Sequence, residues 1–313
     1  MIKTFDKIQE FLAMKADILA RINLIPYDGA IEIKESSGRK YIYLRKKNNN
    51  KYKSTYVGVY SDNLFAAIAK LLKEKKEYEK QLRILEKKLN NLGYVDIELN
   101  HEVLLNIDFA RINMKNSIYN QAILEGIATT FPDTETILEN GKIQGMKGSD
   151  VQKILNLKHA WEFILDEGVI SSSTNLSLLS HVANLVNEGF YIHGGRLRNV
   201  PVSIGGTSYI PPLPIEADIQ DEIKKIVNED EDSVTIAIKL GLYCMKAQIF
   251  NDGNKRAAII FANHYLISKG GGLIIVPEKE MSLFKRLLID YYENNNETAI
   301  FNFMREKCWK KMK

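Results

Sequence analysis

The chain has 313 residues, of which 45% are hydrophobic and 26% are charged, and its formal net charge is +4 at pH 7. This length and apolar content suffice for two domains, or for one large domain with an extension. No apolar run approaches the ~20 residues that a membrane-spanning helix needs, so we expect no membrane partner. Asp6, Glu10 and Asp17 interrupt the amino-terminal stretch, unlike the apolar core of a targeting segment.

The positions of cysteine and histidine argue against a zinc centre. Cys244 and Cys308 have neither metal nor redox spacing, so we expect them to be small core residues in a reducing cytosol. The histidines are scattered along the chain without the spacing of metal ligands: His101, His159, His181, His193 and His264. We therefore predict a cytoplasmic protein without zinc.

Two helices frame a predicted amino-terminal module. Residues 2–25 carry apolar side chains at helical spacing, and a longer periodic stretch begins at the N-cap signal Ser61-Asp62 and reaches Leu92. The exposed side of the longer helix alternates lysine and glutamate, which is typical of a helical hairpin partner or of a coiled-coil arm that makes a homodimer. Gly93 ends this helix, so we predict a module of residues 1–93 and a second domain of residues 94–313.

Between these helices, residues 31–60 form a small basic β element. Its three strand-like runs are separated by turn residues, and eight lysines and arginines face two acidic residues, a local charge of +6. Four tyrosines are interleaved with these cations: Tyr41, Tyr43, Tyr52 and Tyr56. The pattern indicates either a nucleic-acid-contacting element, with rings on which bases can stack, or an edge sheet that lysines keep soluble.

The rest of the chain repeats helical periodicity with short breaks, which predicts a mainly α domain. Helices are expected at residues 101–126, 150–165, 174–188, 216–227, 234–247, 257–268, 279–293 and 297–311. Residues 196–212 differ, because Gly205-Gly206 supplies a turn and Pro211-Pro212 ends strand pairing, as in a short β-hairpin. A strand-like run at 273–276 follows a glycine triplet.

Residues 248–256 form a polar loop that contains glycine and joins two of these helices. Where Asn254-Lys255-Arg256 opens the second helix, free backbone N–H groups and the positive end of the helix dipole make a natural anion site. Asp252 adds a carboxylate suited to magnesium, and the three residues after Gly253 add donors suited to phosphate.

This loop resembles the signature of the Fic/death-on-curing family, His-x-Phe-x-Asp/Glu-Gly-Asn-x-Arg, and matches it at Phe250, Asp252, Gly253, Asn254 and Arg256. Most Fic enzymes catalyse AMPylation, the transfer of AMP from ATP to a hydroxyl side chain of a target protein. The resemblance implies a Fic-type helical core that uses ATP and Mg²⁺. By the same resemblance, Asp252 is the metal ligand, and Gly253, Asn254, Lys255 and Arg256 bind the nucleotide.

Three positions depart from the family pattern. Gln248 stands where the family carries its catalytic histidine, and an amide cannot take the proton of an attacking hydroxyl. Ile259 stands where the family carries its second arginine, and Lys255 stands where it commonly carries a small residue. Both departures make the loop more similar to the death-on-curing branch, whose members resemble protein kinases. Three alternatives therefore stay open: a weak or silent AMP-transferring protein, a phosphotransferase of the toxin–antitoxin type, and a non-catalytic module with a nucleic-acid-contacting amino-terminal element.

Residues 117–126 resemble the inhibitory helix that some Fic proteins carry upstream of the core. Glu125 and Gly126 match the family motif, whereas Gln121 stands at its hydroxyl position. In the family this glutamate pairs with the second arginine of the signature. With Ile259 at that position, Glu125 has to pair with Arg256 or Lys255, or has lost its partner.

The hairpin predicted at residues 196–212 is similar to the Fic flap, a short hairpin over the active site. Such an edge can hold a target peptide through main-chain hydrogen bonds. The resemblance implies that four residues dock the target: Gly205, Gly206, Thr207 and Tyr209.

Overall fold

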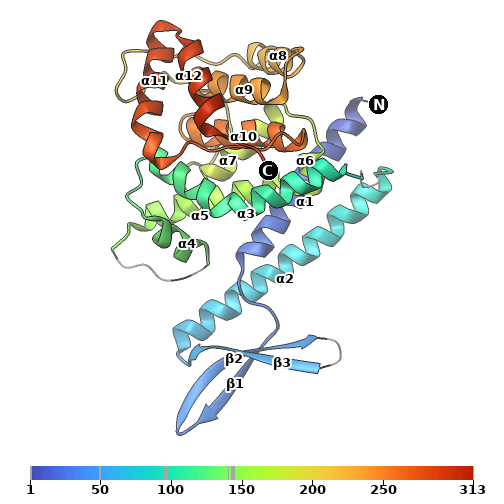
Figure 1. Ribbon diagram of the computed structural model, residues 1–313. Coiled ribbons are helices and arrows are strands. Elements are labelled where there is room, and N and C mark those ends of the chain that lie inside the picture. Colours follow the sequence, from blue (N-terminus) through green and yellow to red (C-terminus); the bar gives the residue numbers. More distant parts are fainter. Residues whose placement is uncertain (1, 49–50, 95–97, 140, 142–144, 313) are drawn as a thin grey trace. The chain divides into compact units, whose positions relative to one another are not determined.

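The computed structural model describes residues 2–48, 51–94, 98–139, 141 and 145–312. The chain divides into two compact units, Met1–Val95 and Asp96–Lys313 (Figure 1). None of the helices in the described part of the chain is long and apolar enough to cross a membrane.

The amino-terminal unit is a pair of helices with a three-stranded antiparallel sheet between them in sequence. Its elements are α1 (Ile2–Leu24), β1 (Ala30–Ser36), β2 (Arg39–Asn48), β3 (Lys51–Val59) and α2 (Asp62–Asn91). The predicted capping residue is confirmed, because the Ser61 hydroxyl accepts a hydrogen bond from the Leu64 N–H at 3.2 Å. The two helices lie along each other (Figure 1), so α2 is a helical hairpin partner, and a dimerisation arm stays a prediction.

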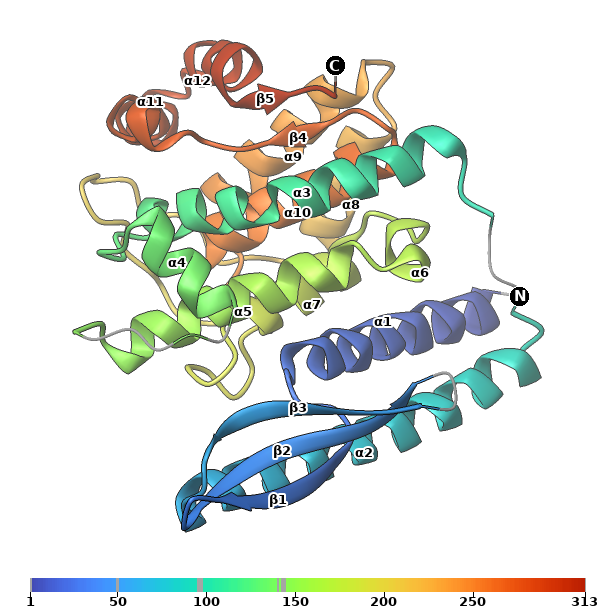
Figure 2. The ribbon, with the colours of Figure 1, turned by 60° about the horizontal axis from the view of Figure 1, so that its bottom comes forward.

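One face of the sheet is covered by the first turns of α2 (Figure 2). Ile42 and Leu44 of β2 are buried against Ile68 of α2, and partly buried apolar residues from β1 and β3 surround them. Because side chains alternate along a strand, the residues between these core positions lie on the opposite face. The predicted turn at 48–50 lies mostly outside the described residues.

The second unit is mainly helical, as predicted. Its helices are α3 (His101–Leu124), α4 (Phe131–Leu138), α5 (Gly148–Ile164), α6 (Glu167–Ile170), α7 (Leu176–Val186), α8 (Glu216–Val227), α9 (Ser233–Ala247), α10 (Asn254–Ser268), α11 (Met281–Asn294) and α12 (Glu297–Phe303). At its centre lies α10, which contacts α9, α7, α3 and α5 (Figure 2). All residues of α10 except Lys255 and Ser268 are buried, so the core is built around the helix that follows the 248–256 loop.

The helix predicted at residues 297–311 is wrong in its second half. After α12 the chain makes a π-helical turn, Met304–Cys308, and then β5 (Trp309–Lys310) pairs antiparallel with β4 (Leu273–Ile274). The Ile275 N–H donates to the Cys308 carbonyl at 2.9 Å. Gly272 allows this pairing, because a Cβ there would lie 2.2 Å from the Lys310 carbonyl oxygen.

The predicted hairpin at residues 196–212 is also corrected, since the segment, all of which is described, contains no strand. Its turn at Gly205 and Gly206 is present, but its backbone groups bond to side chains and not to each other. The Ser208 N–H donates to Glu293, and the Pro211 carbonyl accepts from Arg198 of the same segment. Pro211 and Pro212 lack the N–H groups that a ladder needs, and their carbonyls accept from Arg198 instead. The flap is therefore an irregular loop.

Candidate functional site

The loop between α9 and α10 turns at two left-handed residues. Gln248, with φ of 46°, ends α9, and Gly253, with φ of 74°, precedes α10. A Cβ on Gly253 would lie 2.8 Å from Asn187 Oδ1, so the position requires glycine for both its backbone angle and its neighbour. Ile249 and Phe250 are fully buried and anchor the loop in the core.

Asn254 closes this loop with its side-chain amide. Its Oδ1 accepts from the Phe250 N–H at 2.9 Å, and its Nδ2 donates to the Phe250 carbonyl at 2.8 Å. The same Nδ2 lies 3.1 Å from Gln248 Oε1. The Asn254 side chain thus holds the loop in shape, and what it offers to a ligand is its backbone N–H.

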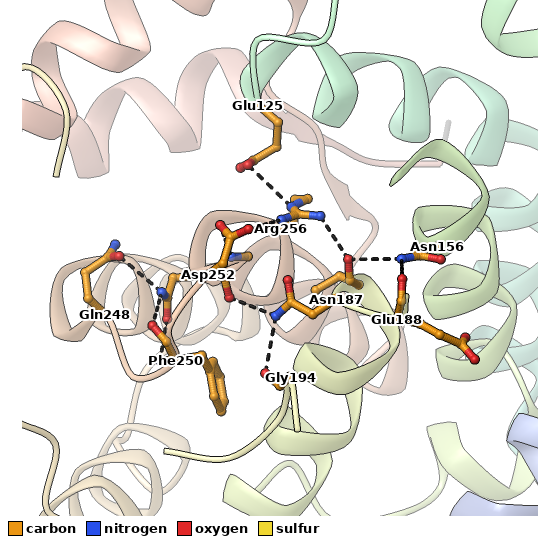
Figure 3. A network of polar contacts seen from close by, with 12 residues as sticks. Glu125, Asn156, Asn187, Glu188, Gly194, Gln248, Phe250, Asp252 and Arg256 are labelled. Carbon is orange, nitrogen blue, oxygen red and sulfur yellow. Dashed lines mark hydrogen bonds and ion pairs between the residues drawn. The ribbon is translucent and has the colours of Figure 1, made fainter. Parts of the chain in front are cut away.

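The Gln248 side chain is held at both ends of its amide. Its Nε2 donates to the Met245 carbonyl at 2.7 Å, and its Oε1 accepts from Asn254 (Figure 3). Tyr292 also contacts it, and its hydroxyl donates to the same Met245 carbonyl at 3.1 Å. The position therefore supplies structural hydrogen bonds and no basic nitrogen.

Arg256 is the central charge of the site and is 1% exposed. One terminal nitrogen donates to the Val186 carbonyl at 2.9 Å, and the other lies 3.4 Å from Asp252 Oδ2. Its Nε lies 3.4 Å from Glu125 Oε2, which reaches down from the end of α3 (Figure 3). Of the alternatives left open by the sequence, the structure shows the pairing of Glu125 with Arg256.

Gly126 and Ile259 explain why this pair forms. Gly126, with φ of 77°, ends α3 directly after Glu125 and turns the chain away. Ile259, one turn along α10 from Arg256, is 3% exposed and lines a small cavity of about 10 Å³, together with Gln121. Gln121 accepts from the Trp161 indole N–H at 2.9 Å. No cation other than Arg256 pairs with Glu125 among the described residues.

A second layer of amides holds Asp252 and Arg256 in place. Asn187 Nδ2 donates to the Asp252 carbonyl at 2.9 Å and to the Gly194 carbonyl at 3.2 Å. Asn156 Nδ2 donates to the Glu188 carbonyl at 2.7 Å, next to the Val186 carbonyl that Arg256 binds (Figure 3). Sequence reasoning missed both asparagines, because Asn156 lies within α5 and Asn187 directly follows α7, and no motif surrounds either of them.

Arg198 connects the flap to the 248–256 loop and was also missed as a functional residue. It is 2% exposed, its backbone N–H donates to the Ile249 carbonyl at 3.0 Å, and its Nε donates to the Gln248 carbonyl. Its terminal nitrogens bond to carbonyls at both ends of the flap, those of Val200, Pro211 and Pro212. Burial lowers the pKa of Arg198, but a guanidinium stays charged in proteins. The sequence signal that could have identified Arg198 is its position in the same segment as Pro211 and Pro212, whose carbonyls need a donor outside a strand ladder.

The tip of the flap rests on α11. Glu293 Oε1 accepts from the Thr207 hydroxyl at 2.7 Å and from the Ser208 N–H at 3.0 Å. The Tyr209 ring stacks on Tyr292 with 6.0 Å between ring centroids. The predicted docking residues therefore lie in a loop that two contacts fix to one helix, and Tyr292 joins this loop to Gln248.

Asp252 has the surroundings of a single-carboxylate magnesium ligand. Its side chain is 44% exposed, and its Oδ1 accepts from the Gly253 N–H at 2.7 Å. The N–H groups of Asn254, Lys255 and Arg256 have no acceptor among the described residues. No three His, Cys, Asp or Glu side chains in the described chain are grouped to hold a metal, so Mg²⁺ fits here only with phosphate oxygens and water as its other ligands.

Residues 175–266 match the family model described as Fic/DOC family. The match covers α7 to α10, and hence Asn187, Arg198 and the whole 248–256 loop. No curated protein sequence matches the chain.

Three solved structures share the fold. A fragment of Fic-1 from C. elegans is 16% identical with a TM-score of 0.51, covering 76% of this chain and 72% of that one. A Fic domain containing signaling protein from Bacteroides thetaiotaomicron is 18% identical with a TM-score of 0.54, covering 66% and 85%. A Fic family protein from Desulfovibrio desulfuricans is 14% identical with a TM-score of 0.52, covering 67% and 73%.

Proposed function

Residues 175–266 make this chain a protein with a Fic/DOC-family domain, and on that premise we propose that the domain binds ATP with Mg²⁺ at residues 252–256 and transfers AMP slowly or not at all. The family includes AMP-transferring enzymes and other transferases. The observation that carries the proposal is Gln248, whose amide is bound to Met245 and Asn254 at the place where a transferase needs a base.

AMP transfer to a hydroxyl requires that the hydroxyl proton leave as the oxygen attacks phosphorus. A neutral amide has no lone pair basic enough to accept it, and the oxygen of Gln248 already accepts from Asn254. Loss of a general base costs about 10²–10⁴-fold in rate. Residual transfer to a target hydroxyl is therefore compatible with this site, whereas normal turnover is not.

The phosphates are expected at the amino terminus of α10. Three backbone N–H groups are free there, and Lys255 adds a cation that forms no ion pair among the described residues. Asp252 would hold Mg²⁺, which neutralises phosphate charge when bound. The donor set thus suits a nucleoside triphosphate better than an uncharged ligand.

Glu125 would restrain this site. Its carboxylate pairs with Arg256, so a phosphate group that uses the guanidinium has to displace it. Glu125 Oε1 is buried without a hydrogen-bond partner among the described atoms, which indicates that the side chain can leave without losing a well-made bond. We expect Glu125 to weaken nucleotide binding through Arg256.

The target is expected to be a protein with a hydroxyl side chain, held along the flap. The backbone N–H of Ser208 bonds to Glu293, so a target strand would have to compete for it. Docking by Gly205, Gly206, Thr207 and Tyr209 therefore requires release of the flap tip from α11.

A labelling experiment tests the proposal. The wild-type chain and Gln248→His are incubated in a host lysate with ATP labelled at the α- or the γ-phosphate, and ATP binding is measured in parallel by calorimetry with Mg²⁺. The matched control is Gln220→His on α8, where the side chain bonds only to Glu216 among the described residues. We expect ATP binding in all three proteins and α-label transfer that is strong only in Gln248→His.

Other outcomes separate the alternatives. Transfer of the γ-label alone would support the phosphotransferase alternative, which Lys255 and Ile259 favour through their resemblance to the death-on-curing branch. No heat with ATP and Mg²⁺, together with a silent Gln248→His, would contradict nucleotide binding and leave a docking module.

A further inference from the structure

The sheet face that points away from α2 carries aromatic and basic side chains together. Strand register places Tyr43 opposite Tyr56, and Lys47 opposite Tyr52, on this face. The described members of this tyrosine–cation face are Lys34, Tyr41, Tyr43, Arg45, Lys47, Tyr52 and Tyr56. They come from all three strands, so the face is continuous across the sheet.

The rings and cations of the tyrosine–cation face are in direct contact. The Tyr43 and Tyr56 rings meet edge to face at 5.5 Å between centroids, and Arg45 lies over the Tyr52 ring at 4.0 Å. Lys34 lies over Tyr43 at 4.7 Å. The cross-strand pairing fixes the rings without covering them, because Tyr52 is 62% exposed and Tyr56 is 54% exposed.

Lysines that only keep an edge sheet soluble do not explain this arrangement. Such lysines require no aromatic neighbours, and large exposed rings lower solubility. Glu32 on the same face is held by Ser54 at 2.8 Å and by Lys34 at 3.4 Å. Arg45 and Lys47 form no ion pair among the described residues, so their charges are available to an anionic partner.

We propose that the tyrosine–cation face binds single-stranded nucleic acid, with bases stacked against Tyr52 and Tyr56 and phosphates beside Arg45 and Lys47. A sheet with exposed rings and adjacent cations offers both components of such binding, stacking and charge neutralisation. A duplex keeps its base faces covered and would use only the cations. This proposal does not depend on the nucleotide chemistry of the second unit.

Binding is measured with the full chain by fluorescence anisotropy of labelled oligo-dT and oligo-U of about 20 nucleotides, with a duplex of the same length as competitor. We expect saturable binding at low salt. With two phosphates neutralised by Arg45 and Lys47, the logarithm of the affinity should fall against the logarithm of salt with a slope of about −1.4. Absence of binding at low salt, or equally tight binding of the duplex, would overturn the proposal.

Variants separate stacking from charge. Tyr52→Ala and Tyr56→Ala should each weaken binding about tenfold, whereas Tyr52→Phe keeps the ring and should leave binding unchanged. Lys47→Gln should reduce the salt slope by about 0.7. The matched controls are Tyr191→Ala, an exposed tyrosine of the second unit, and Lys70→Gln on α2, where the lysine lies 4.0 Å from Glu74.

Circular dichroism verifies that each variant is folded. Tyr52 is the decisive position, because its ring contacts no other ring that the structure describes, so its removal leaves the other rings in place. Equal losses in Tyr52→Ala and in the Tyr191→Ala control would contradict the assignment of the face. Loss in Tyr52→Ala with retention in Tyr52→Phe would establish stacking.

Discussion

The carboxylate of Glu125 and the guanidinium of Arg256 face each other at 3.4 Å, so the end of α3 is tied to the first turn of α10. On its other side Arg256 meets Asp252 at the same distance. One buried cation thus serves two carboxylates, and a phosphate would be a third anion competing for it. Removal of Glu125 should therefore favour a nucleotide.

We expect Glu125→Gln to bind ATP with Mg²⁺ about tenfold more tightly than the wild type, a difference of about 1.4 kcal/mol, because one carboxylate fewer then competes with phosphate for Arg256. Calorimetry at fixed ionic strength measures the difference. Glu135→Gln is the control, because Glu135 is an exposed glutamate on α4 that pairs with Lys115. Unchanged affinity in Glu125→Gln would show that Glu125 does not restrain the site.

Arg256→Met tests how far the same arginine stabilises the fold. The substitution removes the cation that faces the Glu125 and Asp252 carboxylates, and it removes the 2.9 Å hydrogen bond to the Val186 carbonyl. Breaking a buried pair on one side costs about 3–5 kcal/mol. Urea unfolding should show a loss in this range for Arg256→Met and a change within about 0.5 kcal/mol for the exposed Arg286→Met. Equal stabilities would mean that Arg256 serves ligand binding alone.

Two glycines give a matched test of the loop backbone. Gly253 has φ of 74° and would place a Cβ 2.8 Å from Asn187 Oδ1, whereas a Cβ on Gly205 would have no described atom within 4 Å. Gly253→Ala should lower the free energy of unfolding by about 1–3 kcal/mol. Gly205→Ala should leave it unchanged or raise it by about 0.5 kcal/mol. Urea unfolding measures the difference between the two variants in their free energy of unfolding. Equal values would show that the loop relaxes around Asn187.

The helices and the signature loop could be predicted because their signals are local. Apolar periodicity marks α9 and α10, and Gly253 marks the left-handed turn between them. The flap could not be predicted in detail, because its conformation depends on Arg198, whose partners at residues 211, 212 and 248 are distant in sequence. The early end of α12 was missed for the same reason, since β5 pairs with a strand that precedes α11.

The pairing of Glu125 shows the same limit in the site. In the sequence, Ile259 at the position of the second arginine excludes that partner for Glu125. The sequence alone does not decide whether Glu125 pairs with Arg256, with Lys255 or with no residue. The choice follows from burial: Arg256 is buried and faces the largely buried Glu125, whereas Lys255 is one of the two residues of α10 that are not buried.

His264 should make the second unit sensitive to mild acid. Its Nδ1 lies 3.1 Å from the Thr174 hydroxyl and its Nε2 lies 2.8 Å from the Val169 carbonyl, and burial lowers its pKa from 6.5 to about 4. The folded state keeps the ring neutral, while the unfolded chain takes up a proton below pH 6.5. Stability therefore falls as the pH drops from 6.5 towards 4, and this contribution levels off below 4.

Between pH 7 and pH 5 this proton uptake should cost about 2 kcal/mol. Urea unfolding at the two pH values should show that loss in the wild type and in His193→Gln, a variant of an exposed histidine, but not in His264→Gln. If His264→Gln loses as much stability between pH 7 and pH 5 as the wild type, the acid sensitivity belongs to other groups.

Glu293 is expected to control the mobility of the flap. Hydrogen bonds from the Thr207 hydroxyl, and next from the Ser208 N–H, lower the pKa of Glu293. The carboxylate therefore accepts these bonds at neutral pH, and they weaken when acid protonates it, because a neutral carboxyl group is a poorer acceptor. Glu293→Ala should speed hydrogen exchange at the Ser208 N–H at neutral pH, and Glu293→Gln should have a smaller effect because its amide oxygen still accepts one bond.

Exchange is followed at pH 7 by mass spectrometry of flap peptides, with Glu306→Ala as the control for loss of an exposed glutamate. Identical rates in Glu293→Ala and the control would show that stacking of Tyr209 on Tyr292 alone holds the flap.

If the flap docks a target, adding Glu293→Ala to Gln248→His should change the KM for the target and leave the KM for ATP unchanged. The reason is that the phosphate donors lie on α10, whereas Glu293 lies on α11.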